Sequence, residues 1–98
     1  MVRIVIPYHL QTLASCEKEV EVTVQEPVSI RSIVKALEAR YPMLSGTIID
    51  HYTNERRPKV RFFACAEDVS LNSLDDELPA AIVEGKEPLL VVGAISGG

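Results

Sequence analysis

Hydrophobic and polar residues alternate in two short stretches near the N-terminus, which predicts two β-strands. In residues 2–6 the side chains of Val2, Ile4 and Ile6 fall on every second position. In residues 19–24 valine alternates strictly with glutamate or threonine. A period of two places alternate side chains on one face of a sheet, so the second strand is expected to be half-buried. Residues 14–17 suggest a turn, and we expect the two strands to form an antiparallel hairpin.

Between Ser29 and Pro42 the apolar residues follow the spacing of a helix instead. Apolar side chains three and four residues apart form one stripe, which comprises Ile30, Ile33, Val34, Leu37 and Tyr41. Ser29 is a suitable N-cap. Ser32 stands where a capping box carries Glu or Gln, so we expect no full capping box. Pro42 is expected to end the helix, because proline disfavours the helical conformation in the residue before it.

Two further strands are expected, one in residues 60–64 and one in residues 89–92. The second consists of the apolar residues LLVV, as is typical of a strand buried at the centre of a sheet. The connection in residues 70–79 is acidic and has no long period, and Glu84-Gly85-Lys86 is a turn signal. One main helix packed across a mixed sheet predicts the α+β class, with the first and last strands parallel at the sheet centre.

Length and charge narrow the range of functions. With 98 residues, 47% of them hydrophobic and 24% charged, the chain has room for one domain, residues 1–98. Residues 1–63 carry nine basic and seven acidic groups, a net charge of +2, whereas residues 64–98 carry one basic and seven acidic groups, a net charge of −6. The acidic half argues against a nucleic-acid partner, which requires clustered Lys and Arg. No apolar run is long enough for a bilayer and no signal peptide opens the chain, so we expect a cytoplasmic protein without a membrane partner.

Candidate residues for metal binding or catalysis are few. The two cysteines, Cys16 and Cys65, and the two histidines, His9 and His51, lack the spacing of metal ligands or of a nucleophile and its base. We therefore expect no metal site and no catalytic centre. The apolar neighbours of Cys65 favour a buried, inert thiol. The acidic run at residues 75–77 lacks the pattern of a calcium loop and is expected to be solvated.

The sequence closes on five small or apolar residues, which are Ala94, Ile95, Ser96, Gly97 and Gly98. They directly follow the expected central strand, so we predict a flexible C-terminal tail at about residues 94–98. Glycine has no Cβ and enters a narrow passage that a larger residue would block. It also leaves its carbonyl carbon open to attack. A terminal carboxylate of this kind is suited to activation by ATP as an acyl-adenylate and to transfer to a sulfur or amine nucleophile.

Several segments carry a resemblance to a known family. They are VRIVIPYHL at residues 2–10, IVKALEARYP at residues 33–42, and RFF at residues 61–63 followed by EDV at residues 67–69. With the closing AISGG, they resemble the MoaD/ThiS family of ubiquitin-like sulfur carriers over nearly the whole chain. The resemblance implies the β-grasp fold, and length and spacing look closest to the CysO-type carriers, which supply a cysteine synthase. Three features depart from the family. Ala64-Cys65-Ala66 lacks the usual turn asparagine, residues 70–79 form a longer, more acidic link, and the tail reads Ile-Ser-Gly-Gly in place of the frequent Val-Ala-Gly-Gly.

The resemblance implies a carrier rather than an enzyme, and no bound cofactor. A MoeB- or ThiF-like adenylyltransferase would adenylate Gly98 with ATP, and the product would become a thiocarboxylate. A downstream synthase, in which the carrier is at most a small subunit, would take the sulfur for molybdopterin, thiazole, cysteine or another sulfur metabolite. These partners would bind tail residues 94–97 and an exposed apolar sheet face, for which the sequence offers Val92 and Phe63.

Two other functions are compatible with the same sequence. A ubiquitin-like modifier would join the Gly98 carboxyl group to lysines of target proteins by the same activation chemistry. A non-covalent β-grasp interaction domain would make no use of the tail. The sequence leaves open these alternatives, the acceptor pathway, the oligomeric state and the role of residues 70–79.

Overall fold

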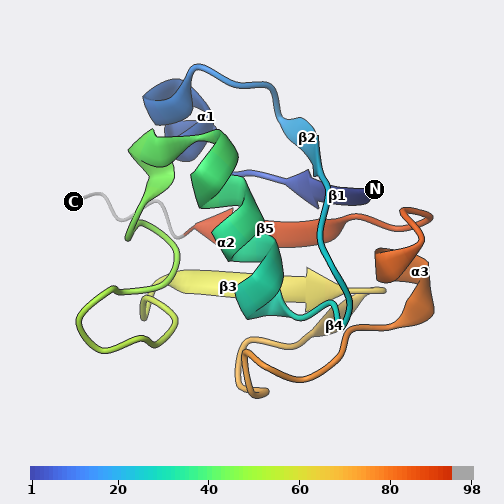
Figure 1. Ribbon diagram of the computed structural model, residues 1–98. Helices are drawn as coiled ribbons and strands as arrows, with labels where there is room; N and C mark the ends of the chain where they lie inside the picture. Colours follow the sequence, from blue (N-terminus) through green and yellow to red (C-terminus); the bar gives the residue numbers. More distant parts are fainter. Residues whose placement is uncertain (94–98) are drawn as a thin grey trace.

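The computed structural model describes residues 1–93, which form a five-stranded sheet crossed by one main helix (Figure 1). The elements follow one another as β1 (Val2–Val5), α1 (Tyr8–Ala14), β2 (Glu19–Val22), α2 (Ile30–Arg40), η1 (Pro42–Leu44), β3 (Val60–Ala64), β4 (Glu67–Asp68), α3 (Ala80–Val83) and β5 (Leu89–Gly93). The η1 element is a short 3₁₀ helix. Across the sheet the strands lie in the order β2-β1-β5-β3-β4.

The first and last strands lie side by side and run parallel, as the sequence predicts. Ile4 pairs with Leu89, and Val5 pairs with Leu90. β2 pairs with β1 and β3 pairs with β5, both antiparallel, and the two-residue β4 extends the sheet beyond β3. A mixed sheet of this order with one main helix across it is the β-grasp form of the α+β class, so the predicted fold is confirmed.

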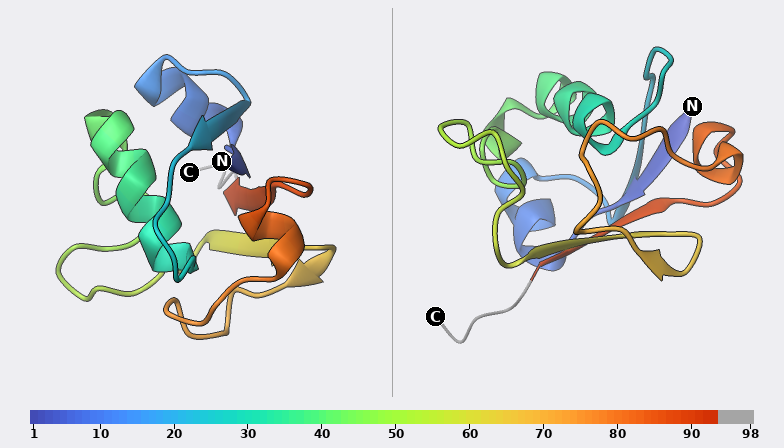
Figure 2. Two further views of the ribbon diagram at one scale, coloured as in Figure 1. Left: turned by 45° about the vertical axis from the view of Figure 1, so that its right-hand side comes forward. Right: turned by 90° about the horizontal axis from the view of Figure 1, so that it is seen from below.

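The hydrophobic core fills the space between α2 and one face of the sheet (Figures 1 and 2). Four residues of the predicted helical stripe are buried: Ile30, Ile33, Val34 and Leu37. The inward-pointing residues of the strands are Val2, Ile4, Val20, Val22, Val60, Phe62, Ala64, Leu89 and Val91. The strand residues between them point to the opposite face of the sheet, because successive side chains of a strand alternate. The helix thus covers one face, and the other face is available for further contacts.

The N-terminus of α2 is capped more completely than the sequence predicts. The Ser29 hydroxyl accepts a hydrogen bond from the Ser32 backbone N–H at 3.1 Å. In return, the Ser29 N–H donates to the Ser32 hydroxyl at 2.8 Å. The expectation of an incomplete capping box was wrong, because a serine hydroxyl at the third helical position accepts the bond that a Glu or Gln oxygen usually accepts. Pro42 follows the C-cap Tyr41, which confirms the predicted helix end.

The connection between the first two strands differs from the expected turn. The strands are antiparallel, as predicted, but the connection contains helix α1. This helix has seven residues, Pro7 at its N-cap supplies no side-chain hydrogen bond, and Leu10 is its buried residue. A helix this short is marginal in isolation, so packing on the rest of the fold stabilises it. No helix within residues 1–93 is both long enough and apolar enough to cross a membrane.

Candidate functional site

The predicted reactive tail, residues 94–98, lies outside the described residues, but the structure describes the point at which it begins. Gly93 is the last residue of β5 and pairs with Val60 of β3. β5 has two strands on each side in the sheet order, so it is the middle strand. The chain therefore passes from the middle strand of the sheet directly into the Gly-Gly sequence, as the sequence analysis predicts for residues 89–92.

A pocket of about 660 Å³ opens beside the end of β5. It is bounded by Val92 and Gly93 from β5, by Val5 from β1, and by Tyr8 and His9 at the start of α1. Figure 2 shows α1 next to the end of β5. His9 is isolated in the sequence from other candidate residues, so this neighbourhood does not follow from spacing along the chain. The available signal was the glycine at the end of an apolar strand, since such a glycine often marks a close approach by another group.

The face of the sheet opposite α2 carries a row of apolar side chains across its three central strands. We call Val5, Phe63, Leu90 and Val92 the open face. Val5 and Phe63 each pair with Leu90 from opposite sides, and the three side chains are half-buried. Val92 is 44% exposed. The structure thus brings together the two residues predicted for partner docking, Phe63 and Val92, and it shows that Phe62 is the one that points into the core.

Two ion pairs join the outer strands of the open face, β1 and β3, to the edge strands β2 and β4. Arg3 contacts Glu19 at 3.0 Å, and Arg61 contacts Asp68 at 2.8 Å. The hydrogen bond between the first pair raises the pKa of Arg3 and lowers the pKa of Glu19. Hydrogen bonds from the hydroxyl and backbone N–H of Ser70, together with the Arg61 guanidinium, lower the pKa of Asp68 to about 2. Both carboxylates are therefore charged at neutral pH and frame the apolar row with fixed charges.

The second histidine lies among groups that resemble a catalytic triad in composition only. His51 Nε2 lies 3.3 Å from Glu38 Oε1 and 3.4 Å from the Ser45 hydroxyl. A triad needs the carboxylate and the nucleophile on opposite ring nitrogens. Here the same nitrogen faces both groups, and the hydroxyl is almost as close to Nδ1, at 3.5 Å. The arrangement therefore lacks the geometry that would activate the serine.

The cysteines differ from each other in their surroundings. Cys65 is exposed in the turn between β3 and β4, so the expectation that it is buried was wrong. Cys65 lies in the turn that follows β3, so its apolar neighbours Phe63 and Ala64 in that strand do not cover it. Cys16 is half-buried, and burial raises the pKa of its thiol. Within residues 1–93, no three His, Cys, Asp or Glu side chains gather into a possible metal site.

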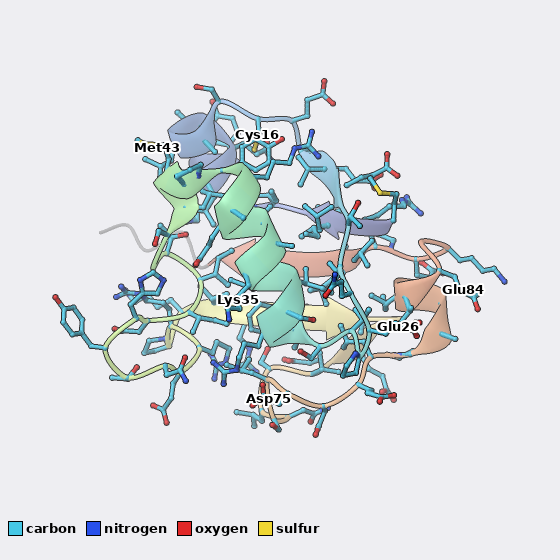
Figure 3. All side chains as sticks on the ribbon, viewed as in Figure 1. Cys16, Glu26, Lys35, Met43, Asp75 and Glu84 are labelled. Carbon is cyan, nitrogen blue, oxygen red and sulfur yellow. The ribbon has the colours of Figure 1, made fainter. Side chains whose placement is uncertain are left out.

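The acidic connection in residues 70–79 is held against the N-terminal end of α2. Arg31 contacts Asp75 at 2.7 Å and also donates to the Asn54 side-chain oxygen at 2.7 Å. Backbone bonds from Arg31 to Leu74 and from Leu78 to Val28 hold the same segment. Figure 3 shows Asp75 beyond the first turn of α2. The segment lies at the helix side of the molecule, away from the open face.

Comparison with solved structures gives three that are similar over almost the whole chain. A chain of the Amycolatopsis orientalis BexX/CysO complex has a TM-score of 0.77 at 21% identity, with 100% of both chains covered. Mycobacterium tuberculosis CysO has a TM-score of 0.76 at 20% identity, over 97% of this chain and 100% of that one. SAMP1 from Haloferax volcanii has a TM-score of 0.73 at 18% identity, over 98% of this chain and 97% of that one.

At these levels of identity, the similarity to the three solved structures is a similarity of fold. No protein-family profile matches the sequence, and no curated protein matches it. The three solved structures nonetheless confirm the β-grasp fold and, at the level of the fold, the resemblance to CysO-type carriers that the sequence indicates.

Proposed function

We propose that this protein is a sulfur carrier whose reactive group is the carboxylate of Gly98. The observation that carries the proposal is the passage of the middle strand β5 into the sequence AISGG, within a fold shared with CysO. The fold holds the base of the tail, and the glycines leave the carboxyl group accessible. The protein acts as a carrier and as the substrate of other enzymes, and it needs no bound cofactor of its own.

The proposed chemistry has two steps before delivery. A MoeB- or ThiF-like adenylyltransferase brings ATP, and a carboxylate oxygen of Gly98 attacks the α-phosphate, which forms an acyl-adenylate and releases pyrophosphate. Hydrosulfide, or a sulfur donor equivalent to it, then attacks the carbonyl carbon. A carbon–sulfur bond forms, AMP leaves, and the chain ends in a thiocarboxylate. ATP is therefore a co-substrate of the partner, and we place the carrier in the cytoplasm, where ATP is available.

Partner binding is assigned to the open face and to tail residues 94–97. The apolar row, half-buried at Val5, Phe63 and Leu90 and exposed at Val92, supplies the area that a partner buries. The charged pairs Arg3–Glu19 and Arg61–Asp68 supply a polar rim. The BexX/CysO complex supports the binding of a partner protein in general, since a chain of the same fold occurs there with a second protein. A synthase that makes cysteine, thiazole, molybdopterin or another sulfur metabolite would take the sulfur in the last step.

Intact mass spectrometry tests the proposal. The purified chain is incubated with ATP, sulfide and a MoeB-like enzyme from the same organism, and its mass is compared before and after. We expect the mass gain of one oxygen-to-sulfur exchange, located at Gly98 by fragmentation. A chain that lacks Gly98 serves as the control and should show no gain.

Other outcomes favour the other functions. Attachment of the chain to lysines of other proteins, without a thiocarboxylate, would favour the modifier. An unchanged mass with several competent activating enzymes would favour a non-covalent interaction domain. In that case deletion of Gly98 would also leave binding to partners unchanged.

A further inference from the structure

We infer that His9 is a positioning residue, which holds the base of the reactive tail in a fixed direction. The inference rests on the proposed function and concerns a residue remote from the reacting carboxylate. Its basis is a close approach between the His9 ring and Gly93, the last described residue of β5. His9 is exposed overall, yet one side of its ring occupies the space where a side chain at position 93 would stand.

The approach is close enough that any residue other than glycine at position 93 would require the exposed His9 ring to move. A Cβ atom added to Gly93 would lie 2.5 Å from Cε1 of His9 and 3.2 Å from its Nε2. It would also lie 3.5 Å from Cγ of Pro7, which is an ordinary contact. The ring therefore packs directly on the backbone of the strand end, and a methyl group there would push it away.

His9 lies on the side of β5 where the end of this strand has no neighbouring strand. On the β3 side, the pairing with Val60 extends to Gly93. On the β1 side, the pairing ends at Leu90, opposite Val5. Beyond that point, Pro7 and His9 take the place of a neighbouring strand. The base of the tail thus has a strand on one side and the His9 ring on the other.

The helix that carries His9 is anchored well enough to hold the ring in place. Leu10 is buried in the core, and the backbone N–H groups of Leu10 and Gln11 both donate to the Pro7 carbonyl at 3.0 Å. The Gln11 side chain donates to the Ile6 carbonyl at 2.7 Å, which ties the helix to the end of β1. The backbone of the helix that carries the ring is therefore fixed relative to the sheet.

A fixed base matters because the reactive carbon is five residues away. A chain of five residues extends at most about 18 Å, so the direction in which the chain leaves Gly93 limits the region that the Gly98 carboxylate can reach. Once the carrier has docked, the fraction of time that the carboxylate spends in the active site of the partner depends on this direction. Loss of the ring should therefore lower the turnover of the docked complex while leaving docking itself unchanged.

The first test compares His9→Ala with the matched variant His51→Ala in the adenylation and thiocarboxylation assay. We expect His9→Ala to lower kcat about fivefold, which corresponds to ~1 kcal/mol, with KM unchanged. His51→Ala should match the wild type. His9→Phe retains a flat ring at this position and should restore most of the turnover. Thermal unfolding of each variant shows whether the fold is intact at the assay temperature.

The second test changes Gly93, the other residue of the contact with His9. Gly93→Ala should displace the ring and lower kcat as His9→Ala does, and the double variant should be no slower than either single variant. Such non-additivity is expected when both changes break one interaction.

The outcomes separate the two proposals. A wild-type chain that forms no thiocarboxylate would overturn the proposed function and this inference with it. A wild-type chain that reacts, with an unchanged kcat for His9→Ala, would overturn only the role of His9. A raised KM with unchanged kcat would also overturn it, because His9 would then belong to the docking surface.

Discussion

At the scale of single residues, the turn between β3 and β4 places two consecutive residues that carry a Cβ at positive φ. Cys65 and Ala66 form the two-residue loop of this hairpin and have φ values of 51° and 68°. Tight hairpins of this kind favour Asn-Gly, because both central residues have positive φ. For a residue with a Cβ, the left-handed conformation costs about 1–2 kcal/mol. The departure from the family asparagine, seen in the sequence, therefore falls on a strained position.

Relief of this strain should be measurable as a gain in stability. Ala66→Gly removes the Cβ at positive φ, and we expect the free energy of unfolding to rise by about 0.5–1 kcal/mol after the entropy lost by glycine is subtracted. Ala36→Gly, in the middle of α2, is the matched control and should lower it by about 1 kcal/mol. Urea denaturation measures both. A loss of stability in Ala66→Gly would mean that the turn relaxes in solution to negative φ.

The lowered pKa of Asp68 predicts how stability depends on pH. The pKa of this carboxyl group falls from its ordinary value of 3.8 to about 2 in the folded protein, through hydrogen bonds from Ser70 and the charge of Arg61. A carboxyl group with a lower pKa in the folded state stabilises the fold above its unfolded pKa. This contribution is lost as the pH falls through the folded pKa. Between about pH 4 and pH 2, Asp68→Asn should therefore lose less stability than the wild type.

Thermal unfolding as a function of pH measures this difference, and NMR titration of the Asp68 carboxyl group gives its pKa directly. A titration midpoint near 4 would contradict the prediction. Glu26, a carboxylate outside any described ion pair, is the control position for the same substitution to the amide.

At the scale of elements, the start of α2 depends on the reciprocal hydrogen bonds of Ser29 and Ser32. Loss of an N-cap hydroxyl typically costs about 1 kcal/mol, so Ser29→Ala should lower the free energy of unfolding by about that amount. Ser32→Ala should also lower it, because it removes the acceptor for the Ser29 N–H. Since both residues serve one capping box, the double variant should cost less than the sum of the single variants. Urea denaturation of the three variants tests this, and strict additivity would contradict it.

The elements also show how far the sequence alone could lead. Strands β1, β2, β3 and β5 and helix α2 were predictable, because each buries a periodic set of apolar side chains. The elements that were missed lack such a set. Helix α1 buries Leu10, helix α3 buries Ile82, and both residues of β4 are exposed. These short elements depend on contacts between distant parts of the chain, and local patterns carry little information about such contacts.

At the scale of the whole molecule, the sequence indicates the tail that we propose as reactive, and the fold shows what surrounds the strand from which it starts. Phe63 and Val92 were chosen from the sequence, but only the strand order places them on one face, because β3 and β5 are neighbours there. The contact of His9 with Gly93 likewise joins residues that are far apart in the chain. Such pairs follow from topology. The acidic residues of the second half lie mainly on segments outside the open face, which keeps that face apolar.

The last prediction concerns the open face as a docking surface. Val92 is 44% exposed and lies beside the base of the tail, so a partner that receives the tail must pass close to it. Val92→Glu places a charge in the apolar row, and burial of that charge by a partner would be costly. In the adenylation assay we expect KM to rise about tenfold, equivalent to ~1.4 kcal/mol, with kcat changed little.

Leu71→Glu is the matched control, because Leu71 is 84% exposed and lies outside the open face. It introduces the same charge and should leave KM unchanged. An equal rise in both variants would show that added negative charge weakens binding wherever it lies, and the partner would then recognise the overall charge of the carrier. A rise in Val92→Glu alone, set beside a lowered kcat in His9→Ala, would separate the surface that binds the partner from the contact that directs the tail.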